Sequence, residues 1–177
     1  MHKSLYFVVF TLIFTLVLGQ NVVLAQTYES NRWYLASDFQ EKIESLSPVV
    51  SQAVVMPVLF SVGLKNISPN FGAPRSGGRS HEGQDIMAIK GTPIISPTEA
   101  VVLRTGYGES AGNYVYTANP GGETFVYMHL DRTGEGVKPG TKLEPGSLIG
   151  YVGDTGNASG GAAHLHFEIH EDRKSVV

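Results

Sequence analysis

Two short segments of this 177-residue chain place histidine and aspartate at spacings that suit a metal site. The segment HLHFEIH places His164 and His166 two residues apart, and the segment SHEGQDI places His81 four residues before Asp85. Residues two apart on a strand point to the same face, so His164 and His166 should project together. His81 and Asp85 also share a face, and the glycine between them favours an extended backbone.

Two imidazoles and one carboxylate suit zinc with a fourth position left for water, which is the pattern of a catalytic site. The spacing leaves open which of His164 and His166 is the ligand. Zinc lowers the pKa of bound water towards about 7 and polarises a carbonyl group, which is the chemistry of amide hydrolysis. His129, at the end of the segment TFVYMHL, and the second member of the pair can then move a proton and stabilise the developing charge.

Each of these signals alone has a simpler interpretation. A histidine pair is more often a half-buried strand position, a His-x3-Asp spacing is often a surface pair, and a single residue such as His129 is more often structural. Their combination in one small chain with only six histidines favours the zinc site. His170 lies near the acidic Glu168, Glu171 and Asp172, so we expect a solvated strand end there.

Composition changes sharply at Gly72. Of the 21 glycines, 19 lie between Gly72 and Gly161, where short β-branched runs alternate with turn residues. Six segments read as strands: TPIISP, EAVVLRTG, GNYVYTA, TFVYMHL, GSLIGYVG and HLHFEIH. The sequence therefore predicts a mainly β domain over residues 68–177, built as an antiparallel β-sandwich or partly open barrel.

The first 25 residues have the features of a secretory signal peptide. Lys3 precedes an apolar run over residues 5–18, and small residues lead to a cleavage position after Ala25. An uncleaved anchor is the alternative, and both place the domain outside the cytoplasm, in the periplasm or the cell wall. The absence of cysteine excludes disulfides, thiol catalysis and a lipoprotein anchor. A formal charge of -3 argues against nucleic acid as a partner.

Residues 26–67 form an extension that is poor in glycine. Ser37 can cap a short helix in SDFQEKIESL. The apolar run over residues 49–64 reads equally as a packed strand or as a helix interrupted at Pro57. The extension can be a linker, a regulatory segment that blocks a groove, or part of the core.

The ordered blocks FGAPRSGGRSHEGQDI, GTPIISPTEAVVLRTG, GNYVYTA, YMHLD, VKPGTKLEPGSLIGYVGDTG and HLHFEI together resemble the lysostaphin-like, or LytM-type, zinc metalloendopeptidases. These enzymes cut peptides in bacterial peptidoglycan. The resemblance covers about residues 68–170 and implies an antiparallel β-fold with a groove. It also implies one Zn²⁺ held by His81, Asp85 and His166, with His129 and His164 as the catalytic pair that shares the roles of base and oxyanion stabiliser or proton donor.

The resemblance implies hydrolysis of peptide cross-links in the stem peptides or cross-bridges of peptidoglycan, with a regulatory protein as a possible partner. The glycine-rich turns over residues 106–112, 121–122 and 153–161 should form the groove walls, with Tyr114 and Tyr127 facing either the wall or the core. A non-catalytic wall-binding module that regulates an amidase is the alternative. A carbohydrate-acting or phosphocarrier protein is a third hypothesis, disfavoured by the signal peptide and by the lack of paired carboxylates.

Overall fold

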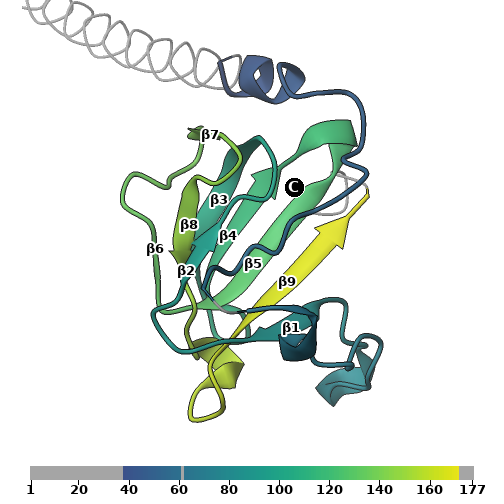
Figure 1. Ribbon diagram of the computed structural model, residues 1–177, viewed down its shortest axis with the longest axis vertical. Helices are drawn as coiled ribbons and strands as arrows, with labels where there is room; N and C mark the ends of the chain where they lie inside the picture. Colours follow the sequence, from purple (N-terminus) through teal and green to yellow (C-terminus); the bar gives the residue numbers. More distant parts are fainter. Residues whose placement is uncertain (1–37, 61, 172–177) are drawn as a thin grey trace, which may run out of the picture. The chain divides into compact units, whose positions relative to one another are not determined.

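Antiparallel strands dominate the computed structural model, which describes residues 38–60 and 62–171 (Figure 1). The larger sheet contains, in spatial order, β1 (Gln84–Met87), β9 (His164–His170), β5 (Thr124–Leu130), β4 (Gly112–Ala118), β3 (Ala100–Gly108) and β7 (Lys142–Leu143). The smaller sheet contains β2 (Pro93–Ile95), β8 (Leu148–Tyr151) and β6 (Arg132–Thr133). All pairings are antiparallel, and the predicted mainly β fold is confirmed.

Two short 3-10 turns, η1 (Leu64–Asn66) and η2 (Ser76–Gly78), precede β1, and two others, η3 (Pro120–Gly122) and η4 (Gly156–Ala158), connect strands. A β-strand forms in each of the six segments predicted as strands. Strands β4, β5 and β9 have the expected bounds, and β3 runs two residues past its predicted segment. The sequence did not indicate the two-residue strands β6 and β7, because two residues carry no recognisable alternation.

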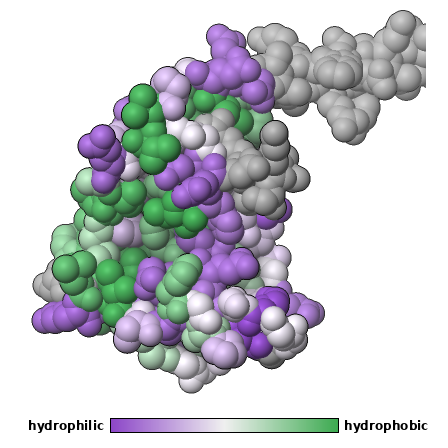
Figure 2. Space-filling model, turned by 90° about the vertical axis from the view of Figure 1, so that its right-hand side faces the viewer, coloured by the Kyte–Doolittle hydropathy of each residue, from purple (hydrophilic) through white to green (hydrophobic). Residues whose placement is uncertain are grey.

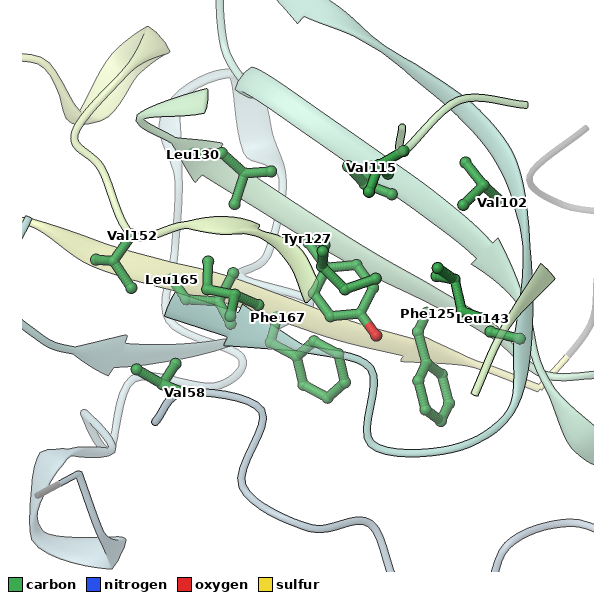
Figure 3. Packing of buried hydrophobic residues seen from close by; sticks show 14 of the residues in the cluster. Val58, Val102, Val115, Phe125, Tyr127, Leu130, Leu143, Val152, Leu165 and Phe167 are labelled. Carbon is green, nitrogen blue, oxygen red and sulfur yellow. The ribbon is translucent and has the colours of Figure 1, made fainter. Parts of the chain in front are cut away.

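The core contains residues of both sheets (Figure 3). Ile94 and Ile149 come from the smaller sheet, and Tyr127, Leu165 and Phe167 come from the larger one. Strand alternation sends Leu165 and Phe167 into this core, so His164 and His166 on β9 face the opposite side of the sheet. Tyr127 is fully buried and belongs to the core rather than to a groove wall.

Residues 42–60 and 62–67, here called the N-terminal strap, pack against the β domain. Val58 is 3% exposed and pairs with Ile94 of β2, next to a hydrogen bond from the Leu59 amide to the Pro93 carbonyl. Ile67 pairs in the same way with Ile86 of β1. Within the described part of residues 49–64, the run forms neither a helix of the expected kind nor a regular strand, because single bridges to the β domain replace regular pairing.

The strap also leaves large hydrophobic side chains exposed, among them Val49, Val55 and Phe60. Figure 2 shows that hydrophobic residues gather in patches between hydrophilic ones on the side of the molecule that it presents. The backbone is helical over residues 38–44, as predicted, whereas Ser37 and the predicted signal peptide lie outside the described residues. Among the residues that the structure describes, no helix is long and apolar enough to cross a membrane.

Candidate metal and catalytic site

Pairing between β1 and β9 brings the predicted metal ligands together. Asp85 lies directly opposite His166 in this register, and both side chains point to the face away from the core. His81 lies three residues before β1. The His81 Nε2 atom is 3.1 Å from Asp85 Oδ1 and 2.9 Å from His166 Nδ1, and His166 Nδ1 is 2.8 Å from Asp85 Oδ1.

Hydrogen bonds on the far side of each ring select the nitrogen that faces the cluster. His81 donates from Nδ1 to the Asn70 carbonyl at 2.9 Å, because a carbonyl can only accept, and Nε2 keeps its lone pair. His166 donates from Nε2 to the Glu168 carboxylate at 2.7 Å, which leaves Nδ1 to face Asp85. These bonds therefore orient both imidazoles so that His81 Nε2 and His166 Nδ1 face Asp85.

This donor set fits zinc. The three ligand atoms lie within 4.8 Å of one another, and all three residues are buried. Donors bound to a tetrahedral zinc at 2.0–2.2 Å lie roughly 3.3 Å apart, which is close to the separations in this cluster. Burial favours the neutral form of Asp85, but hydrogen bonds from His166 and Asn70 outweigh it and lower the pKa of this carboxyl. Asp85 is therefore an anion that can bind a cation.

His166 carries a proton that a zinc ion bound at this site would have to displace. Burial lowers the pKa of His166, but hydrogen bonds to Asp85 and Glu168 outweigh this effect and raise it to about 9. Metal affinity should therefore weaken as the pH falls below this value.

His129 reaches the same face through an irregular backbone. On β5, Tyr127 faces the core and Met128 faces the groove, so strict alternation would turn His129 back towards the core. Instead His129 has a left-handed φ of 62°, next to a register shift between β4 and β5. Two successive side chains therefore line the groove, as happens at a β-bulge.

His129 and His164 form a second pair beside the ligands. Their ring centroids are 4.9 Å apart. Each ring donates from Nδ1 to a backbone carbonyl, His129 to Thr155 at 3.0 Å and His164 to Ala162 at 2.9 Å. In the neutral form of each ring, the lone pair is therefore on Nε2. Burial, reinforced by repulsion from His164, lowers the pKa of His129 to about 4, so this ring is neutral at neutral pH.

A groove of about 820 Å³ runs over these residues. Two of the three predicted glycine-rich turns line it, through Ser110 and Ala111 and through Asn157 and Ala158. The turn at residues 121–122 does not, because Gly121 packs against Val50 of the strap. No described residue of the strap lines the groove.

Two groups that orient the ligands were not predicted. The Asn70 side-chain amide donates to Asp85 Oδ2 at 2.6 Å, and the Asn70 backbone carbonyl accepts from His81 Nδ1. Glu168 accepts from His166 through one oxygen and from His170 through the other, each at 2.7 Å. The expectation of a solvated His170 was wrong, since this ring is partly buried and lines the groove. His166, Glu168 and His170 are two residues apart on one strand, so the sequence already placed their side chains on the same face. That spacing was the signal from which contacts of Glu168 with both histidines could have been predicted.

Replacing Glu168 with glutamine should weaken zinc binding by about 10- to 100-fold, because the neutral amide holds the His166 ring less firmly. Competition against a chromophoric chelator measures this affinity. Glu82→Gln is the matched control, since Glu82 is exposed and lines the same groove. Wild-type zinc affinity in Glu168→Gln would show that Glu168 does not orient the ligand.

Comparison with known proteins gives consistent results. The sequence profile of peptidase family M23 matches residues 79–177. A peptidoglycan DD-endopeptidase of Vibrio cholerae is 34% identical over 126 residues, covering 68% of this chain and 28% of that protein. An L-Ala–D-Glu endopeptidase of Bacillus subtilis is 34% identical over 101 residues, covering 54% and 31%. The chain thus spans about a third or less of the length of these relatives.

Among solved structures, the catalytic domain of lysostaphin from Staphylococcus simulans superimposes with a TM-score of 0.52 at 29% identity. The match covers 58% of this chain and 77% of that domain.

Proposed function

Because this chain belongs to peptidase family M23 through residues 79–177, we propose that it is a zinc-dependent endopeptidase that hydrolyses peptide cross-links of bacterial peptidoglycan. The observation that carries this proposal is the convergence of His81, Asp85 and His166 on one point. The V. cholerae and B. subtilis relatives, named as endopeptidases, support the substrate class.

In this proposal His81, Asp85 and His166 hold one zinc ion. When bound, zinc supplies a Lewis acid that polarises the peptide carbonyl and makes water acidic enough to react near neutral pH. Asp85 adds negative charge to the site, and Glu168 and Asn70 keep the ligands oriented. The groove over the larger sheet accepts the peptide.

His129 and His164 move the proton and stabilise charge. In its neutral form each ring has a lone pair on Nε2, so either ring can then accept a proton from water and return it to the leaving amine. Once protonated, a ring is a cation that can donate a hydrogen bond to the developing oxyanion. The neutral state of His129 at neutral pH suits the role of acceptor.

Export follows from the proposed substrate, since peptidoglycan lies outside the cytoplasm. The predicted signal peptide over residues 1–25 would serve this export, and the periplasm or the cell wall is the proposed location. We also propose that a regulatory protein binds this enzyme, as the family resemblance implies. The alternative of a non-catalytic wall-binding module is disfavoured because the complete set of three ligands is present.

Digestion of purified peptidoglycan from several bacterial types tests this function. We expect new amino termini that disappear when a chelator removes the metal and return when zinc is added, and mass analysis of the fragments identifies the bond. Reducing sugar ends without new amino termini would contradict the proposal. So would zinc content near zero in natively folded protein.

A further inference from the structure

The guanidinium of Arg104 stacks on tyrosine rings in the groove, away from the proposed metal ligands. Arg104 of β3 pairs with Tyr116 of β4, and the centre of its guanidinium is 3.9 Å from the Tyr116 ring centroid and 5.8 Å from that of Tyr114. The two tyrosine rings meet edge to face at 5.4 Å. We call Arg104, Tyr114 and Tyr116 the Arg104 shelf.

The shelf is held in place by the neighbouring backbone. Gly106 pairs with Tyr114, and a Cβ atom at Gly106 would lie 2.7 Å from Tyr114 Oη. The missing side chain therefore lets the Tyr114 ring lie over β3. A guanidinium within about 6 Å of an aromatic face is attracted by the ring, so Arg104 is oriented in the free protein.

Arg104 differs from a second stacked arginine in what its guanidinium binds. Arg132 lies 3.8 Å from the Tyr151 ring and also forms an ion pair with Asp131 at 2.7 Å. Within the described residues, the ion pairs include no carboxylate partner for Arg104. A stacked guanidinium keeps its N–H groups at the edge, where they match the two oxygens of a carboxylate.

The sheet register relates the shelf to the metal site. Glu168 of β9 pairs with Val126, Val126 pairs with Tyr116, and Tyr116 pairs with Arg104. These paired residues form one line across the sheet, and the neighbouring line on the same face contains Asp85 and His166. Arg104 and Tyr116 also line the same groove as the proposed metal site. Strand β4 is two strand spacings from β9, or about 10 Å, which an extended peptide covers in about three residues.

We infer that the Arg104 shelf binds a carboxylate of the substrate about three residues from the bond that is cleaved. The enzyme then prefers peptides with free carboxylates, such as stem peptides with a diamino acid, over neutral oligoglycine bridges. This inference rests on the proposed function, since it assigns the substrate class of the same groove.

The test compares two cross-linked stem peptides that differ only in whether their carboxylates are free or amidated. Wild-type protein should cleave the free acid with about tenfold higher kcat/KM, the gain expected for a charged hydrogen-bonded contact. Arg104→Gln should lose this preference, mainly through a higher KM. Arg104→Lys should keep part of it, because lysine retains the charge without the planar fork. Arg132→Gln, which removes a stacked arginine outside the groove, should behave as wild type.

Equal rates on the two peptides in wild-type protein would overturn the inference, and so would an unchanged preference in Arg104→Gln. Binding to zinc-free protein by calorimetry separates this question from catalysis. Tighter binding of the free acid by wild type, lost in Arg104→Gln, supports the shelf even if no cleavage occurs, in which case only the proposed function fails. Equal binding of both peptides contradicts the shelf independently of activity.

Discussion

Replacing His81 with alanine should reduce peptidoglycan hydrolysis by roughly 1000-fold or more. The substitution removes one of the three proposed zinc ligands. A bound zinc ion contributes several kcal/mol of transition-state stabilisation, and each 1.4 kcal/mol corresponds to about a factor of ten in rate. Zinc content by mass spectrometry should fall together with the release of new amino termini. The effect should be specific to the ion, because chelated wild-type protein should show the same loss.

His170→Ala is the matched control for this substitution. His170 lines the same groove but binds Glu168 rather than facing the ligand cluster. We expect it to keep stoichiometric zinc and to lose far less activity than His81→Ala. Unchanged hydrolysis in His81→Ala would refute the mechanism.

Replacing His129 with asparagine should lower kcat by about 100- to 10,000-fold, the usual contribution of a general acid or base, while zinc content stays at the wild-type level. Asparagine is chosen because it tolerates the left-handed φ of 62° at this position better than alanine does. Stability should therefore change little, and thermal unfolding measures this directly.

The pH dependence gives a second readout of His129. Its pKa is lowered to about 4, so the neutral ring that accepts a proton is present above this pH and is lost as the pH falls through it. The limb of the wild-type kcat/KM profile that belongs to this group should lie near pH 4 and should be absent in His129→Asn. An activity of His129→Asn within twofold of wild type would show that this ring does not transfer the proton.

Regular strands made much of the site predictable. In HLHFEIH the alternation of apolar and polar residues fixes which side chains enter the core, so His164 and His166 share the groove face as expected. The spacing of His81 and Asp85 also indicated a shared face, and their atoms are 3.1 Å apart. These predictions need only the local geometry of one strand.

Departures from regular geometry could not be read in the same way. Alternation would have placed His129 in the core, and only the left-handed backbone at a register shift turns it to the groove. Asn70 orients the ligands through a carbonyl, which every residue type has, so its sequence position carries no signal for that contact. Arg104 lies on β3, and nothing local shows that β4 brings aromatic rings beneath it.

The contacts of Asn70 with Asp85 and His81 bear on where the catalytic domain begins. The family profile starts at residue 79, yet the carbonyl that orients His81 and the amide that binds Asp85 both come from residue 70. Farther upstream, Val58 covers Ile94 of the core. The stretch that the family profile matches is thus shorter than the stretch that positions the site residues. A catalytic unit moved into another protein would have to carry its own upstream segment with it.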